Sequence, residues 1–222
     1  MHVKVLNVVG FKEGALFMRL PLNSEKMSDT ISNELGPKDF DLIKRLTKAG
    51  SDHSKILRMI QVYALVKMPF NWWKHYDTYK VGTTAISRST MHKGLGDRLL
   101  TKNDFYVDVW NKENQLTLDL LNNLQEEFFY AKENKLPTKE LWRRLIDLMP
   151  CSMLQERGLN LNYQVLLNIL GARYQVEKLS PEWNFFCEEM LNQCPYLSDL
   201  WEVVKSKRTM TTEEFRKMET KK

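Results

Sequence analysis

The sequence lacks the motifs of several large classes of catalytic and binding sites. It contains no Gly-rich dinucleotide fingerprint, no Walker phosphate loop and no nucleophile elbow around a serine or cysteine. It also has no HxH, HExxH or CxxC pattern. These absences leave a Rossmann domain without support and make a metal site an unexpected feature of this chain.

Long apolar runs and paired cysteines are missing as well. No run reaches the roughly 20 apolar residues that a membrane-spanning helix needs. The N-terminal segment MHVKVLNVVGFKEG does not have the architecture of a signal peptide. The cysteines are Cys151, Cys187 and Cys194, an odd number without a metal-type pair. We therefore expect a cytoplasmic, reduced protein with no membrane association.

The composition is that of a globular protein with a sizeable core. The chain has 222 residues, of which 43% are hydrophobic and 27% charged, and it includes six tryptophans. Its formal net charge is +5. This mild excess is compatible with a nucleic acid or a phosphorylated small molecule as partner, and equally with solubility alone. The net charge therefore does not distinguish between these functions.

Strand patterns lie early in the chain and helical patterns late. Residues 2–9 alternate and are rich in valine, and residues 15–22 follow after a turn, so we expect two strands that form a hairpin. A helix is expected from Lys38 to Gly50, and a buried strand ending at Pro69. Residues 70–80 predict a short helix. The small, polar segment 81–96 predicts a loop.

The second half predicts four helices. The segments are residues 111–135, residues 137–150 with Pro137 near the first turn, residues 160–174, and residues 180–195 with Ser180 as N-cap and Pro181 in the first position. We expect an α+β fold, with an antiparallel sheet early in the chain packed against a long C-terminal helical region. One domain over residues 1–205 and a charged tail over residues 206–222 are expected.

The apolar helix expected at residues 160–174 carries polar groups that are costly to bury without partners, namely Asn162, Asn168 and Arg173. A turn of about 100° per residue places Asn162 and Arg173 within about 20° of each other, whereas Asn168 projects elsewhere. One side could then offer an amide and a cation to a groove. Alternatively, each group caps or bridges neighbouring loops inside the protein.

Two central segments combine cations with hydroxyls or aromatic rings. The loop at residues 81–96 supplies hydroxyls, including Thr84 and Ser89, with Lys80 and Arg88 nearby, and such a loop can hold a phosphate. It can equally be a polar surface loop. The segment WWKHYDTYK permits base or flavin stacking, or only the closure of a core edge by aromatic side chains.

The spacing of these residues resembles the flavin-dependent thymidylate synthases (ThyX). In that family a Leu-Pro is followed by Asn, by a second Asn six residues later, and by Arg five residues after that. Here Met149-Pro150 precedes Asn162, Asn168 and Arg173 at this spacing. The strand ending VKMP resembles the family's Val-Lys-Ala-Pro, and His53 precedes it as a family histidine does.

The resemblance implies ligands for these residues. His53, Asn162 and Asn168 would contact flavin adenine dinucleotide (FAD), and Arg173 would bind a dUMP-like nucleotide. Carboxamides suit flavin or adenine edges, and a guanidinium suits phosphate or a pyrimidine carbonyl. The resemblance further implies a homo-oligomer, with a tetramer as the family's assembly.

The chain departs from the family's signature, Arg-His-Arg-x-x-Ser-x-Asn-Glu-x-Ser-x-Arg-Tyr. With one inserted residue before it, this motif falls on residues 79–92. Thr84 and Ser89 match the two serines, and Ser89 then stands where the family activates its substrate. The other matched positions differ. In this chain the family's Arg-His-Arg is replaced by Tyr79-Lys80-Val81, its Asn-Glu by Ile86-Ser87 and its later Arg by Met91. Outside the signature, a family arginine before the Leu-Pro is replaced by Ile146.

Remaining cations could compensate for the lost ones, namely Lys80, Arg88, Arg143 and Arg144. Two functions follow from the resemblance. The first is a flavin-dependent enzyme similar to thymidylate synthase, with Ser89 and Arg173 positioning a pyrimidine nucleotide. The second is an inactive scaffold that binds nucleotides or a protein partner. Binding of nucleic acid through the basic, aromatic central segment is a third and less supported reading.

Overall fold

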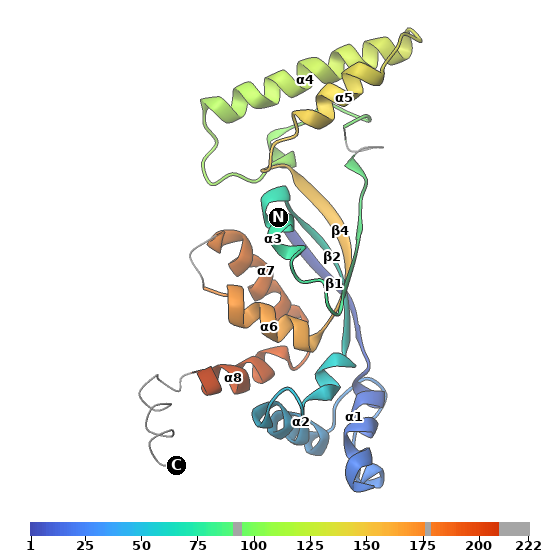
Figure 1. The fold of residues 1–222 in the computed structure, drawn as a ribbon, viewed down its shortest axis with the longest axis vertical. Helices are drawn as coiled ribbons and strands as arrows, with labels where there is room; N and C mark the ends of the chain where they lie inside the picture. The colour runs from blue at the N-terminus through green and yellow to red at the C-terminus, as the bar shows by residue number, and fades with distance from the viewer. Residues whose placement is uncertain (91–94, 176–178, 209–222) are drawn as a thin grey trace. The chain divides into compact units, whose positions relative to one another are not determined.

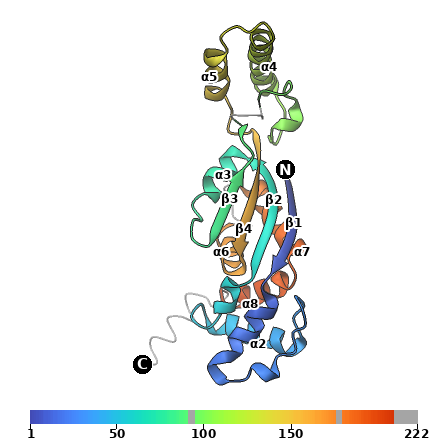
Figure 2. The ribbon, with the colours of Figure 1, turned by 90° about the vertical axis from the view of Figure 1, so that its right-hand side faces the viewer.

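The fold is built around a four-stranded sheet. The computed structural model describes residues 1–90, 95–175 and 179–208 (Figure 1). The antiparallel strands are β1 (His2–Val9), β2 (Gln61–Pro69), β3 (Thr83–Ser87) and β4 (Leu154–Asn162), in the order β1-β2-β4-β3 (Figure 2). Every second residue of β2 from Val62 to Met68 is buried, which is the alternation of a pleated strand. The expected α+β class is confirmed.

The chain divides into two compact units. Unit 1 comprises residues 1–2, 66–78 and 86–158, and unit 2 comprises residues 3–65, 79–85 and those from 159 onward. All four strands contribute residues to both units. The organisation as one domain over residues 1–205 stays a prediction. The C-terminal helix α8 (Leu197–Arg208) contains the start of the expected tail, and residues 209–222 of that tail lie outside the described part.

In the described part of unit 2, helix α6 (Tyr163–Arg173) contacts both α7 (Ser180–Gln193) and α8 (Leu197–Arg208), and α2 (Pro37–Ala49) packs against α8. Its core is closed by the fully buried aromatic side chains of Phe11, Tyr163, Trp183 and Phe186. The Phe11 ring meets the Tyr163 ring edge-on, with 5.8 Å between centroids. The helices are α1 (Phe11–Arg19), α2 (Pro37–Ala49), α6 (Tyr163–Arg173), α7 (Ser180–Gln193) and α8 (Leu197–Arg208), with short 3-10 helices at Leu20–Leu22, Glu25–Met27 and Lys55–Arg58.

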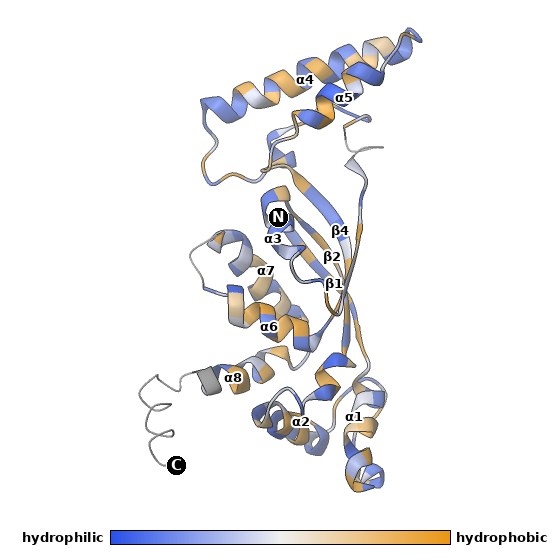
Figure 3. Cartoon of the chain, viewed as in Figure 1, coloured by the Kyte–Doolittle hydropathy of each residue, from blue (hydrophilic) through white to orange (hydrophobic). Residues whose placement is uncertain are grey.

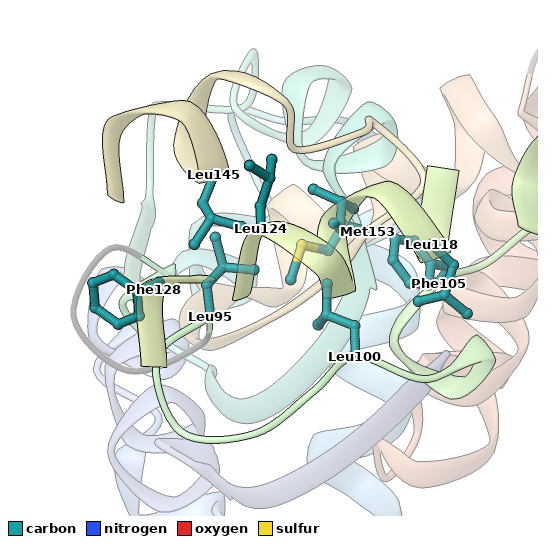
Figure 4. Close-up of a cluster of buried hydrophobic side chains, with 9 residues drawn as sticks. Leu95, Leu100, Phe105, Leu118, Leu124, Phe128, Leu145 and Met153 are labelled. Atoms are coloured by element: carbon teal, nitrogen blue, oxygen red, sulfur yellow. The ribbon is translucent and has the colours of Figure 1, made fainter. Parts of the chain in front are cut away.

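Unit 1 has its own hydrophobic core beneath a helical hairpin. The helices are α3 (Phe70–Tyr76), α4 (Lys112–Glu133) and α5 (Lys139–Asp147), with a 3-10 helix at Lys102–Asp104. Helix α4 alternates between apolar and hydrophilic residues along its length (Figure 3). Its apolar side chains Leu121 and Leu124 pack with residues of α5 and of the loops, including Leu145, Leu100 and Met153 (Figure 4).

Several predicted elements are confirmed. Helix α2 begins at Pro37 and ends before Gly50, whose φ of 125° lies in a region that side-chain-bearing residues rarely adopt. Strand β2 ends at Pro69, and the short helix α3 follows it. The long periodic segment forms α4. Among the described residues, no helix has the length and apolar character needed to cross a bilayer.

The expected N-terminal hairpin is wrong, because the second segment is helix α1. Its buried positions are Phe11, Gly14, Ala15 and Arg19, a spacing of three and four residues that fits one side of a helix. Gly10 separates β1 from α1 with a φ of 97°, and a Cβ there would lie 2.3 Å from the Met59 carbonyl oxygen. The chain therefore turns into a helix at a position that only glycine suits.

The loop expected at residues 81–96 contains strand β3. Four of its five residues are exposed, so it has no apolar alternation to reveal it. Its place in the sheet comes from pairing with β4, which the backbone bond from Arg88 N to Glu156 O (2.8 Å) continues. Residues 91–94 of this segment lie outside the described part.

Helix boundaries differ from the prediction at three places. Residues 154–162 form strand β4, so α6 begins at Tyr163 rather than at residue 160. Leu179, with a φ of 52°, is the N-cap of α7, so Ser180 and Pro181 are its first two residues. Pro137 precedes the N-cap Thr138 of α5 and is not in its first turn. Element ends are where sequence patterns are least specific.

Candidate functional site

Helix α6 in unit 2 begins at Tyr163, and Asn162, the last residue of β4, serves as its N-cap. The Asn162 backbone is extended, with φ −107° and ψ 167°, and its Oδ1 accepts a hydrogen bond from Val165 N at 3.0 Å. This satisfies one of the free N–H groups of the first turn. Asn162 and Arg173 therefore do not share one side of a helix, and the expectation based on helical angles is wrong for Asn162. The reading of Asn162 as a cap holds.

Asn168 presents its amide on the exposed side of α6. Its Oδ1 accepts a hydrogen bond from Gln164 Nε2 at 3.1 Å, one turn earlier on the helix. Its Nδ2 group makes no hydrogen bond within the described residues. Asn168 is thus a free amide donor on the surface of unit 2.

Arg173 ends α6 in an aromatic setting. Its Nε donates to the Tyr79 hydroxyl at 3.0 Å. Its guanidinium carbon lies 5.8 Å from the Tyr79 ring centroid and 5.5 Å from that of Trp183, within the range of cation–π attraction. Its two Nη groups make no hydrogen bond to any residue that the structure describes. The side chain is held in place and keeps donors for another group.

The segment of residues 79–85 contacts the start of α6. Gly82 has a φ of 73°, and a Cβ there would lie 2.7 Å from Asn162 Nδ2. Only glycine allows this approach without displacement of the asparagine. Lys80 and Thr84 are exposed on the same segment. Unit 2 therefore brings Lys80 and Thr84 into one region of the molecule with Asn162 and Arg173, through the contacts of Gly82 and Tyr79.

His53 lies in an exposed turn after α2. Its backbone N donates to Gly50 O at 3.1 Å, and its imidazole makes no hydrogen bond to the described residues. The structure thus gives His53 the environment of a loop residue. Within the described part of the chain, no group of three His, Cys, Asp or Glu side chains could hold a metal ion.

Arg88 and Ser89 in unit 1 line a cavity of about 290 Å³. Two cations that the sequence reading did not single out, Lys67 and Arg98, lie in the same wall. The lining is Lys67, Arg88, Ser89, Thr90, Arg98, Asp104, Met153, Leu154, Gln155 and Glu156. We call it the Ser89 cavity. Met91, the position of the family's later arginine, lies outside the described residues.

Two of the three cations of the Ser89 cavity are paired with carboxylates. Arg88 donates to Glu156 Oε2 from Nε at 3.0 Å and from Nη2 at 2.7 Å. Arg98 makes a two-point pair with Asp104, at 2.5 and 2.8 Å. Lys67 makes no ion pair with the residues described. Three cations and two carboxylates leave a formal charge of +1, which favours an anionic ligand.

The Arg98–Asp104 pair changes the titration of both groups. Partial burial alone would raise the pKa of Asp104, but hydrogen bonds from Arg98 and Thr101 outweigh it and hold this pKa below its usual value. The hydrogen bond to Asp104 raises the pKa of Arg98. Both groups are therefore charged near neutral pH, and Asp104 fixes the guanidinium at the cavity wall.

Arg143 and Arg144 lie on helix α5, outside the lining of the Ser89 cavity. Arg143 pairs with Asp147 at 2.9 Å, and Arg144 lies 3.7 Å from Glu127. Both side chains are more than half exposed. They have the surroundings of surface ion pairs, which contribute about 0–1 kcal/mol to stability.

No family model and no curated protein matches the sequence. The structure, in contrast, resembles solved ones. Thymidylate Synthase X (ThyX) from Helicobacter pylori, crystallised with FAD and dUMP, aligns with a TM-score of 0.68 at 19% identity, covering 90% of this chain and 99% of that chain. A second structure of the Helicobacter pylori enzyme, also with FAD and dUMP, gives 0.67 at 18% identity, covering 91% and 97%.

A third solved structure also aligns. The UMP/dUMP methylase PolB from Streptomyces cacaoi, bound with 5-Br dUMP, gives a TM-score of 0.60 at 12% identity, covering 92% of this chain and 94% of that chain. At these identities the likeness establishes the fold and leaves the activity open. The chain has a divergent ThyX-like fold over nine-tenths of its length.

Proposed function

We propose that this chain is a ThyX-fold protein that binds a pyrimidine nucleotide. The single observation that carries the proposal is the Ser89 cavity, whose wall holds Lys67, Arg88 and Arg98 and only two carboxylates. A nucleotide phosphate would bind to Lys67. It would also replace Glu156 as the partner of Arg88, or share Arg88 with it, because the Arg88 side chain is 74% accessible. Ser89 lines the same cavity, and a hydroxyl can both donate and accept hydrogen bonds.

We further propose that α6 and residues 79–85 hold FAD, the group with which the Helicobacter pylori ThyX structures of this fold were crystallised. The donor set of unit 2 fits such a group, because Lys80 and the Nη groups of Arg173 suit a pyrophosphate and Asn168 suits a ring edge. Asn162 would contribute its Nδ2, since its Oδ1 already caps α6. His53 and Thr84 would add exposed polar contacts. A bound flavin supplies hydride chemistry.

The assembly and setting belong to this proposal. A homo-oligomer, with a tetramer as the expected state, agrees with the exposed large apolar side chains of unit 2, among them Leu22 and Ile31. A cytoplasmic setting agrees with three free cysteines. Arg143 and Arg144 would act as surface cations that attract an anionic nucleotide and would not contact it in the Ser89 cavity.

A second function, nucleotide binding without turnover, is favoured by one contact. Tyr79 stands where the family has the first arginine of its signature. Its hydroxyl accepts a hydrogen bond from Arg173 Nε. A neutral group thus replaces a cation in the proposed flavin and substrate region. This group also uses one of the hydrogen-bond donors of Arg173, its Nε. Assays for methylated product on dUMP and UMP distinguish the two functions, since formation of product excludes the inactive scaffold.

Replacement of Arg88 with glutamine should weaken nucleotide binding. The variant loses a charge-assisted hydrogen bond to phosphate, worth roughly 1.5–3 kcal/mol, which is about tenfold or more in affinity. Thermal unfolding should show dUMP or UMP stabilising the wild type, by about 2.7 kcal/mol at a hundredfold excess over the dissociation constant. Arg45→Gln, at an exposed pair on α2, is the charge-matched control. Equal stabilisation of wild type and Arg88→Gln would remove the Ser89 cavity as the phosphate site.

The flavin part has a separate test. The purified protein should be yellow, or should take up added FAD with a change in the flavin absorption bands. Asn168→Ala should weaken that uptake, because it removes the free amide of α6. A colourless protein that takes up no FAD contradicts the flavin part and leaves the nucleotide part standing.

A further inference from the structure

A surface cavity of unit 1 lies where the helical hairpin of α4 and α5 meets the loop at Gly96 and Asp97. It has a volume of about 290 Å³ and shares no lining residue with the Ser89 cavity. We call it the Trp142 cavity. Its lining is Gly96, Asp97, Phe128, Lys132, Thr138, Lys139 and Trp142. This volume is at the small end of ligand sites and suits one aromatic ring with an attached group.

Helical spacing brings the lining side chains of each helix to one side. Phe128 and Lys132 are four residues apart on α4, so they lie on the same side of that helix. Lys139 and Trp142 are three residues apart on α5 and share a side in the same way. The Trp142 backbone is held in the first turn of α5 by the bond from its N to Thr138 O at 2.9 Å. Each helix thus contributes one aromatic ring and one cation to the cavity.

The aromatic wall of the cavity is held by packing. Phe128 is 9% exposed and lies at one end of the buried cluster of unit 1 (Figure 4). The Trp142 ring lies against it, with 5.1 Å between the centroids and 38° between the planes. Gly96 approaches the same indole, since a Cβ there would lie 3.6 Å from Trp142 Cζ3. Trp142 is only partly buried, so part of its ring surface is available to a planar ligand.

Two lysines give the Trp142 cavity its charge. Lys132 and Lys139 are exposed, and neither makes an ion pair with a residue that the structure describes. Two lysines against the one carboxylate of Asp97 leave a formal charge of +1. Thr138 adds a hydroxyl, because its side chain makes no capping hydrogen bond to α5. The wall therefore offers ammonium and hydroxyl donors beside an aromatic ring.

An adjoining hollow shows on which side an anion is favoured. Its lining is Gly96, Asp97, Phe129, Lys132 and Glu133. One lysine there faces two carboxylates, which leaves a formal charge of −1. Lys139 belongs to the Trp142 cavity and not to this hollow. The excess of positive charge is therefore confined to the side that carries the Trp142 ring.

We propose that the Trp142 cavity is a second ligand site, for a small molecule whose aromatic ring directly carries a phosphate or a carboxylate. The ring stacks on Trp142, and the anionic group binds Lys132 and Lys139. Asp97 accepts a hydrogen bond from an N–H or O–H group of the ligand where the ligand has one. The site does not depend on nucleotide binding in the Ser89 cavity.

The test follows the Trp142 ring by fluorine NMR in the chain labelled with 5-fluorotryptophan. Each of the six tryptophans contributes one signal, and Trp142→Phe identifies the signal of Trp142 by its loss. Titration with phenyl phosphate or benzoate, at constant pH and ionic strength, should shift this signal to saturation. The tighter of the two identifies the preferred anion. Benzyl alcohol, a neutral ring, and inorganic phosphate, a bare anion, should each bind about tenfold more weakly or less.

Variants connect the shift to the two lysines. In the double variant Lys132→Gln/Lys139→Gln, the affinity for the anionic probe should fall about tenfold or more, because both charge-assisted contacts are lost. Lys135→Gln removes a lysine of the same hairpin that lies outside the lining, and it should respond as the wild type does. Arg88→Gln should also respond as the wild type does, so failure of the proposed nucleotide site would leave this result intact.

Three outcomes would overturn the proposal. The first is that neither anionic probe shifts the Trp142 signal. The second is that the double variant binds the anionic probe as tightly as the wild type. The third is that benzyl alcohol or inorganic phosphate binds as tightly as the anionic probes, since the ring and the anion would then not act together.

Discussion

Replacing Asp39 with alanine should lower the free energy of unfolding by about 3–5 kcal/mol, because it leaves a buried arginine without its partner. Asp39 is fully buried, and its Oδ1 accepts a hydrogen bond from Arg19 Nε at 2.5 Å. Its Oδ2 accepts from the hydroxyls of Ser28 and Thr30, at 2.6 Å each. One carboxylate thus joins α1, α2 and the segment between them.

The measurement is urea unfolding followed by circular dichroism, compared with Asp41→Ala. Asp41 lies on the same helix and pairs with Arg45 on the surface, at 2.9 Å. An exposed pair contributes about 0–1 kcal/mol, so this control should change stability little. If the two variants lose the same free energy, the buried network around Asp39 does not have the role assigned to it.

The same carboxylate makes part of the stability depend on pH. Burial alone would raise the pKa of Asp39, but hydrogen bonds from Ser28, Thr30 and Arg19 outweigh it and lower this pKa below the ordinary value of 3.8. The contribution of Asp39 is then complete above that value and is lost as the pH falls through the lower pKa of the folded state. The difference between wild type and Asp39→Ala should therefore shrink below about pH 4.

Replacing Gln125 with methionine should destabilise unit 1 by about 2–6 kcal/mol, since each of the two carbonyls left without a donor costs about 1–3 kcal/mol. Gln125 is fully buried in α4, and its Nε2 donates to Leu95 O at 2.6 Å and to Arg98 O at 2.9 Å. Leu100 N keeps a second acceptor, Asn122 Oδ1 at 2.9 Å. The variant therefore leaves two carbonyls unpaired.

Gln125 also positions a wall of the Ser89 cavity. It fixes the backbone of Arg98, whose side chain lines that cavity. The free energy of unfolding, measured with denaturant, and the affinity for the nucleotide should consequently both fall in Gln125→Met. Asn123→Met, at an exposed position of the same helix, should stay within about 0.5 kcal/mol of the wild type and keep its affinity. Unchanged stability of Gln125→Met would contradict this role.

Elements with a local pattern could be predicted from the sequence, and those fixed by distant pairing could not. Pro37 and Gly50 bound α2 as expected, and α4 follows its apolar period. Strand β3 has no buried side to produce alternation, and only its pairing with β4 makes it a strand. The alternation of residues 2–9 and the turn before residues 15–22 suggested a hairpin, although the buried positions of α1 have a helical spacing.

The site was predictable to the extent that it lies in short motifs. The spacing of Asn162, Asn168 and Arg173 indicated the fold that the comparison confirms. The spacing did not predict that Asn162 ends a strand and caps the following helix. Lys67 and Arg98 were missed because the Ser89 cavity gathers residues from separate segments. No sequence periodicity connects β2, the loop after β3 and the start of β4.

The most direct test of the central claim is calorimetric titration of dUMP into the wild-type chain. We predict saturable binding at one site per chain that weakens as salt is raised, because the Ser89 cavity binds the phosphate through cations. UMP should bind the same site, and uridine, which lacks the phosphate, should not. The absence of binding heat for both nucleotides, supported by an unchanged unfolding temperature, would contradict the account.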